Sequence, residues 1–175
     1  IVTHPCAPHD VLDLIAQLTA AFSSQRGVAD RAQSLQGELR GALDEARAAV
    51  LPPTPVLYLV WRDPWMTVAR DTYISRLLAL ANWQTWPDAH GGATGAARYP
   101  VLRGDEPGLA EVREVLLSSE PYAFNESHRQ QAQALCPQAR VRLVDGELLS
   151  WYGPRAAAGL RYLGELAGLI DAARG

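Results

Sequence analysis

Hydrophobic positions recur at helical spacing in the first third of the chain and then give way to short apolar runs. From Asp10 onward they fall at Val11, Leu14 and Ile15 and continue every third or fourth residue, as one face of a helix does. Residues 28–50 repeat this pattern with a polar opposite face, which predicts a helix of roughly 35 Å at about 1.5 Å per residue. After a proline-rich stretch, the apolar runs lie at residues 56–60, 114–117 and 141–144.

Each apolar run is short enough to be a buried strand, and each is followed by a loop and then by a helical pattern. Asp71 or Thr72 is expected to cap the helix after the first run, and Asn125 the helix after the second. Three consecutive strand–loop–helix units predict an α/β fold with a parallel sheet and right-handed crossovers.

The remaining segments complete this pattern. Asp145 and Gly146 are expected to form a turn after the third run, before a final helix over residues 156–173. Residues 81–104 are rich in glycine and show no period, so they predict a long loop of the kind that is usually functional or mobile. Residues 1–3 read as a short strand.

Composition narrows the function classes. The 175 residues suffice for one domain, and a hydrophobic content of 48% allows a sizeable core. A net charge of -3 gives no electrostatic case for binding nucleic acid or an anionic membrane surface. No apolar run approaches the ~20 residues of a membrane span, so the chain is not expected to be membrane-spanning. Residues 1–3 also lack the charged start of a signal peptide.

Cysteine and histidine do not predict a metal site. Cys6 and Cys136 could form one disulfide, although nothing in the sequence shows that they meet. The four histidines match no ligand spacing, so neither a metal nor another cofactor is expected. Ser118, Ser119, Glu120 and His128 raise the alternative of a small hydrolase, but no GxSxG elbow supports it.

Aromatic and charged side chains gather in the loops that follow the strands. Loops at the carboxyl ends of parallel strands share one edge of the sheet, where α/β proteins bind ligands. The candidate ligand-binding residues in these loops are Arg62, Asp63, Trp65, Met66, Tyr122, Trp151, Tyr152 and Arg155. Trp61 is expected to be structural, because alternation along the strand turns it the other way.

Two interpretations of these residues remain open. Trp65, Tyr122 and Trp151 could form a stacking floor for a flat macrocycle, or they could pack into the core. The arginines could hold an anionic group of a ligand through bidentate contacts, or they could form surface ion pairs such as Arg62 with Asp63.

Four segments in this order resemble one family. They are WRDPWMTVARDTYISRLL, RYP, LLSSEPYAF and RLVDGELLSWYGPRAAAGLRYL. Together they are similar to the carboxyl-terminal lobe of the helical-backbone substrate-binding proteins of ABC importers, of the cobalamin and metal-chelate type. The resemblance implies a three-layer α/β lobe with a small, mostly parallel sheet, preceded by a long backbone helix.

The resemblance also implies a domain organisation. Residues 1–8 would be the remnant strand of a missing first lobe, residues 9–51 the interlobe backbone helices, and residues 55–175 the ligand-binding lobe. Half of the ligand cleft would then belong to the first lobe. Tyr99, which follows Arg98, would face the cleft, and Asp105 or Glu106 would be an acid that docks on the permease.

The function implied is non-enzymatic. Such a protein captures cobalamin, haem, a ferric siderophore or another metal-chelate compound in a periplasmic or extracytoplasmic space and delivers it to an ABC permease. The alternative is an isolated lobe that acts as a protein-contact module and forms a homodimer.

Overall fold

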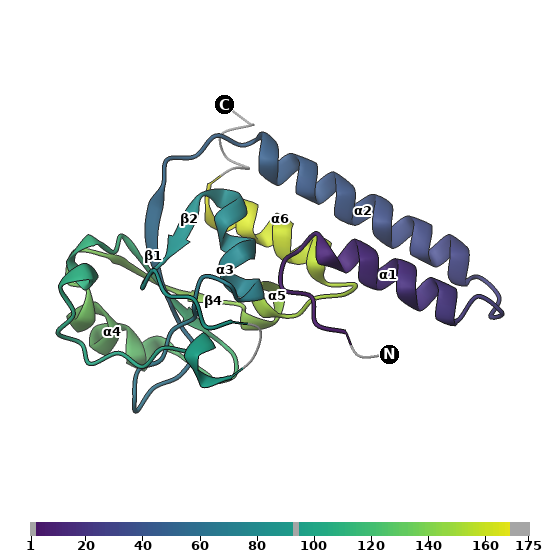
Figure 1. The fold of residues 1–175 in the computed structure, drawn as a ribbon. Helices are drawn as coiled ribbons and strands as arrows, with labels where there is room; N and C mark the ends of the chain where they lie inside the picture. Colours follow the sequence, from purple (N-terminus) through teal and green to yellow (C-terminus); the bar gives the residue numbers. More distant parts are fainter. Residues whose placement is uncertain (1–2, 93–94, 169–175) are drawn as a thin grey trace.

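The computed structural model describes residues 3–92 and 95–168, and its centre is a four-stranded parallel sheet (Figure 1). The strands, in spatial order, are β2 (Trp83–Thr85), β1 (Thr54–Leu59), β3 (Glu114–Ser118) and β4 (Arg140–Val144). β1 pairs with β2 on one side and with β3 on the other, and β4 pairs with β3. The predicted α/β fold with a small parallel sheet is confirmed.

Both faces of the sheet are buried, which explains why its strands read as continuous apolar runs. In β1, Val56 and Tyr58 point into one hydrophobic cluster, whereas Leu57 and Leu59 point into the other. All four side chains are fully buried, as alternation along a central strand requires.

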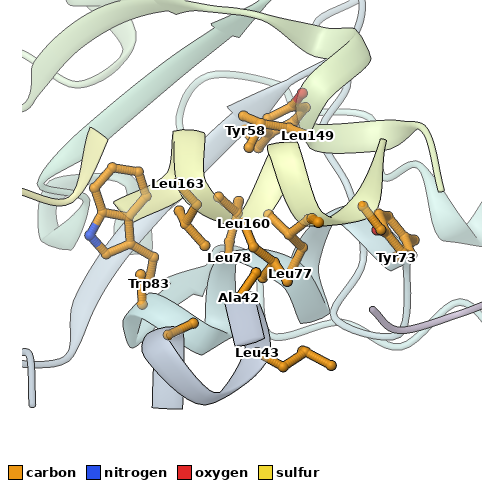
Figure 2. Packing of buried hydrophobic residues seen from close by; sticks show 14 of the residues in the cluster. Ala42, Leu43, Tyr58, Tyr73, Leu77, Leu78, Trp83, Leu149, Leu160 and Leu163 are labelled. Carbon is orange, nitrogen blue, oxygen red and sulfur yellow. The ribbon is translucent and has the colours of Figure 1, made fainter. Parts of the chain in front are cut away.

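Helices cover the two faces unequally. The cluster that contains Tyr58 also holds residues of α3 (Tyr73–Leu78), α5 (Gly146–Ser150) and α6 (Ala156–Leu166). Figure 2 shows Leu77 and Leu78 of α3 close to Leu160 and Leu163 of α6. On the other face lie α4 (Arg129–Leu135) and the 3₁₀ turn η3 (Pro107–Glu111). The predicted three-layer lobe is therefore present.

Two antiparallel helices precede the sheet. α1 (Asp10–Ala21) and α2 (Val28–Ala48) lie side by side and project away from the sheet (Figure 1). Gly27 joins them with a positive φ of 79°, a conformation that glycine adopts without strain. The buried side chains of α2, which include Leu39 and Leu43, lie in its second half and pack toward α6. The predicted long helix before the lobe is confirmed.

Several elements differ from the sequence prediction. β2 lies inside the stretch predicted to be a loop. The sequence did not predict this strand because three residues are too few to show a period. Asp145 does not form a simple turn, since its side chain accepts the Leu148 amide and caps α5. Thr72 and Asn125 cap their helices as expected.

Some predictions fall at the ends of the chain. The final helix, expected over residues 156–173, ends at Leu166, and Thr3 is not part of a strand. Residues 169–173 of the expected helix, and Ile1 and Val2 of the expected first strand, lie outside the described residues. Cys6 and Cys136 are free cysteines, and burial raises the pKa of the Cys136 thiol to about 11. None of the helices in the described ranges is both long and apolar enough to cross a bilayer.

Candidate functional site

A hollow of about 420 Å³ opens at the carboxyl edge of the sheet. Its lining residues are Val60, Trp61, Met66, Ile74, Tyr99, Glu120, Pro121, Ser150 and Trp151. The chain passes from β1 to β2 on one side of β1 and from β3 to β4 on the other side of β3, so the winding direction reverses between β1 and β3. Open α/β sheets bind ligands at this kind of switch point.

Three exposed aromatic side chains form much of the lining. The exposed fraction is 42% for Trp61, 42% for Tyr99 and 53% for Trp151. Large aromatic rings that gather around one hollow instead of packing into the core indicate a surface that contacts another molecule. The volume is within the range of about 300–1,000 Å³ that is typical of small-molecule sites.

Backbone pairing brings Tyr99 to the end of β1. Met66 forms isolated antiparallel bridges with both Trp61 and Val101. On the same segment, the Thr67 amide donates to the Pro100 carbonyl at 3.0 Å. Residues 98–102 therefore run beside residues 65–69, and the aromatic ring of Tyr99 joins a lining that starts far away in the sequence.

Trp151 is held by two charged neighbours. Its indole Nε1–H donates to the Glu120 Oε2 atom at 2.7 Å. The Arg155 guanidinium lies 5.6 Å from the centroid of the indole ring and forms an ion pair with Glu147. The position of the Trp151 ring is thus fixed although half of its surface is exposed.

A buried hydrogen-bond chain supports the loop that carries Glu120. The Tyr58 hydroxyl donates to the Ser118 Oγ atom at 3.0 Å, and Ser118 Oγ donates to the Glu120 carbonyl at 2.6 Å. Burial raises the pKa of Tyr58, so the phenol stays protonated and remains a donor. Gly146 passes close to this loop, since a Cβ atom there would lie 2.7 Å from the Glu120 amide nitrogen.

The structure brings three of the predicted site residues together at the hollow, namely Met66, Tyr99 and Trp151. Trp65 and Tyr122 lie behind the lining. The Trp65 ring is parallel to that of Phe124 at a centroid distance of 6.0 Å. Tyr122 supports Trp61 edge-on at 5.6 Å.

The other predicted residues lie around the hollow without lining it. Arg62 pairs with Asp63 at 3.3 Å and stacks over Trp65. Tyr152 is 40% exposed and contacts the ring of Tyr73. The role of these residues and of Arg155 in binding stays a prediction.

Two lining residues were missed or misread in the sequence. Trp61 was expected to turn away, but alternation no longer applies after the strand ends, and the bridge from Trp61 to Met66 turns the chain there. Glu120 was predicted to lie in the loop after the second apolar run, at the shared edge of the sheet, but it was not among the predicted ligand-binding residues. The structure places it in the lining of the hollow.

The residues of the hydrolase alternative are engaged elsewhere. Ser118 is fully buried, and its Oγ atom accepts a hydrogen bond from the Tyr58 hydroxyl and donates one to the Glu120 carbonyl. His128 bonds the Tyr122 hydroxyl through Nε2 and accepts the Asn125 amide through Nδ1. Within the described ranges, no hydrogen bond joins Ser118 to His128, and no group of three or more His, Cys, Asp or Glu residues could hold a metal ion.

Asp71 holds the glycine-rich segment near Tyr99. Its carboxylate accepts the amides of Gly91 at 3.0 Å and Gly92 at 2.5 Å. Burial opposes the charged form, but these amides and the positive charge of Arg98 outweigh it and hold the pKa of Asp71 below its ordinary 3.8. A lowered pKa means that the stabilisation is present above the unfolded-state pKa of about 3.9 and is lost as the pH falls through the folded-state pKa.

We therefore expect Asp71→Asn to speed amide exchange at Gly91 and Gly92 about fivefold at neutral pH, because a charge-assisted bond open to solvent contributes about 1 kcal/mol. The protection factors of these two amides, measured by NMR relative to the intrinsic exchange rate, should fall below about pH 4 in the wild type but not in the variant. Asp88→Asn, at an exposed partner of Arg70, is the matched control. Unchanged exchange in the Asp71 variant would contradict this role.

The two candidate docking acids differ in their surroundings. Both oxygens of Glu106 accept backbone amides, from Arg103 at 2.8 Å and Gly104 at 2.9 Å. Burial alone would raise the pKa of Glu106, but these bonds lower it. Asp105 is 78% exposed and pairs with Arg103, which is equally exposed. Asp105 is therefore the freer carboxylate.

An apolar groove of about 300 Å³ lies between α1 and α2. Its lining includes Leu18 and Phe22, which are 39% and 47% exposed. Exposed apolar surface on these helices is the feature that a protein-contact module requires.

Comparison with known proteins identifies the fold. No protein-family model matches the sequence, and no curated protein matches it. Among solved structures, the periplasmic vitamin B12 binding protein BtuF of Vibrio cholerae has a TM-score of 0.69 and 18% identity, covering 95% of this chain and 63% of that one. The periplasmic heme binding protein HutB of Vibrio cholerae has a TM-score of 0.68 and 17% identity, covering 97% and 66%.

A third structure, an ABC transporter substrate-binding protein from Listeria monocytogenes, has a TM-score of 0.70 and 16% identity, covering 92% of this chain and 64% of that one. The chain therefore spans 63–66% of the lengths of these three proteins. The resemblance seen in the sequence is confirmed at the level of fold: the chain has the architecture of the helical-backbone periplasmic binding proteins.

Proposed function

We propose that this chain is the lobe and backbone helix of a substrate-binding component of an ABC importer. It captures cobalamin or another metal-chelate compound in an extracytoplasmic space and delivers it to the permease without catalysing a reaction. The observation that carries this proposal is the hollow at the switch point of the sheet, where Trp61, Tyr99 and Trp151 expose their rings. Flat macrocycles bind to such rings because stacking buries a large area at little entropic cost.

The test is a titration of the chain with cyanocobalamin, haemin and a ferric siderophore. Binding is followed by quenching of tryptophan fluorescence, corrected for ligand absorbance, and by calorimetry. We expect saturable binding of one ligand per chain for at least one of the three compounds. If the full-length natural protein binds none of them, the proposal is wrong.

Delivery requires a contact with the permease, and we expect Asp105 to supply it. Asp105→Asn should lower affinity for a permease that binds the wild-type protein about fivefold, since exposed charges across an interface contribute modestly. Ligand affinity should stay unchanged, because Asp105 does not line the hollow. Binding to permease in nanodiscs measures the effect, and Glu111→Gln, at another exposed acid, is the control. Full permease affinity in the Asp105 variant would exclude this docking role.

The groove between α1 and α2 favours a second candidate function, a protein-contact module that forms a homodimer. Sedimentation velocity distinguishes the two candidates. A stable dimer that dissociates in Phe22→Asp and binds no metal chelate would favour the contact module.

A further inference from the structure

The lining of the hollow is almost free of charged side chains. Eight of its nine residues are apolar, aromatic or uncharged polar side chains. The ninth is Glu120, and no arginine or histidine in the described part of the chain lines the hollow. A bound molecule would therefore meet aromatic faces and one carboxylate.

Two arginines beside lining residues are already engaged in ion pairs. Arg155, which lies over the Trp151 ring, is paired with Glu147. Arg62, behind the lining, is paired with Asp63. Glu120 itself has no ion pair within the described residues, and the net charge presented to the hollow by these groups is negative.

The carboxylate of Glu120 can accept more hydrogen bonds than the one that it receives from Trp151. Its Oε2 atom accepts the Trp151 indole N–H at 2.7 Å. A carboxylate offers about four lone-pair positions on two oxygens. The indole uses one of them, so the group can accept further N–H donors from a ligand that lies against Trp151.

We propose that Glu120 determines specificity and that the hollow selects an uncharged, planar metal complex whose rim carries amide N–H donors. Amide side chains of such a complex donate to the Glu120 carboxylate while the ring stacks on Trp61 and Trp151. A complex with peripheral carboxylates, such as haem with its two propionates, brings like charges together in a partly desolvated site and is rejected. This inference rests on the function proposed above and names its substrate class.

Two pairs of probes isolate charge from shape. Cyanocobalamin is compared with a derivative in which one amide is hydrolysed to the carboxylic acid, and haemin is compared with its dimethyl ester. In each pair the macrocycle is the same and the carboxylate charge differs. Dissociation constants are measured by calorimetry with the full-length protein at low and moderate salt.

We expect the wild-type protein to bind cyanocobalamin at least tenfold more tightly than the acid derivative and more tightly than haemin. In Glu120→Gln, which keeps the side-chain shape and an acceptor for Trp151, the preference for the amide form should fall to less than threefold. Added salt should reduce the wild-type preference as well, because screening weakens the repulsion. Glu111→Gln, at an exposed acid before β3 and away from this edge, should keep the full preference.

Each outcome has one meaning. Tighter binding of haemin than of cyanocobalamin, or an unchanged preference in Glu120→Gln, overturns the inference and leaves the importer function standing. Binding of none of the four probes also overturns the inference, and the importer function then depends on the siderophore titration described above, since it fails only if the siderophore does not bind either.

Discussion

Replacing Trp151 with alanine is expected to weaken binding of cyanocobalamin about 30-fold. The ring is half exposed, lines the hollow and is oriented by Glu120, so a ligand can cover it without displacing core atoms. Removing a buried aromatic anchor from an interface typically costs about 2 kcal/mol, which corresponds to this change in dissociation constant. The effect is measured by calorimetry, because the remaining tryptophans complicate fluorescence.

The free energy of unfolding of the Trp151 variant should stay within about 0.5 kcal/mol of the wild type, as for most exposed positions. Phe22→Ala is the matched control, since Phe22 is 47% exposed but lies in the groove between α1 and α2. Trp65→Ala provides the contrast, because this ring stacks on Phe124 and its loss should lower stability more than Trp151→Ala does. Full affinity in the Trp151 variant would remove this residue from the site.

The second large effect concerns stability. Ser118→Ala should lower the free energy of unfolding by about 2 kcal/mol, since it leaves the buried Tyr58 hydroxyl and the Glu120 carbonyl without a partner. Tyr58→Phe should cost less, about 1 kcal/mol, because Ser118 still bonds to the Glu120 backbone. Urea denaturation followed by tryptophan fluorescence gives both values.

The double variant tests whether the two hydroxyls act together. When both are removed, the buried Tyr58 hydroxyl is no longer left unpaired, so the combined loss should be about 1 kcal/mol smaller than the sum of the single losses. Ser34→Ala, at an exposed hydroxyl on α2, should change stability by less than about 0.5 kcal/mol. Strictly additive losses in the free energy of unfolding would show that the two hydrogen bonds that link Tyr58, Ser118 and Glu120 are not cooperative. A change in ligand affinity in Ser118→Ala would further show that this chain positions the Glu120 loop.

Three strands of the central sheet could be predicted because both of their faces are buried by apolar neighbours. β1, β3 and β4 are short apolar runs buried on both faces, and Thr72 and Asn125 mark the helices that follow. β2 could not be found in this way. It has three residues, and its assignment depends on backbone pairing with β1, which no local pattern records.

The site was predictable in its location but not in its composition. The rule that strand ends share one edge placed Met66 and Trp151 correctly at the hollow. It did not separate Trp61 from Trp65, because the turn that begins at Trp61 reverses which side chain faces outward. It also did not show that Arg155 is paired with Glu147 or that Glu120 bonds to Trp151.

The sequence by itself therefore determined the α/β class, the long helix before the lobe and the edge of the sheet at which the hollow lies, since these depend on periodicity and on the order of elements. The tertiary structure decided which aromatic rings stay exposed, which arginines are neutralised and which acid faces the hollow. These properties depend on distances between residues that are far apart in the chain, such as the 2.7 Å from Trp151 to Glu120. Short-range electrostatics and hydrogen bonds are sensitive to such distances, whereas hydrophobic periodicity is not.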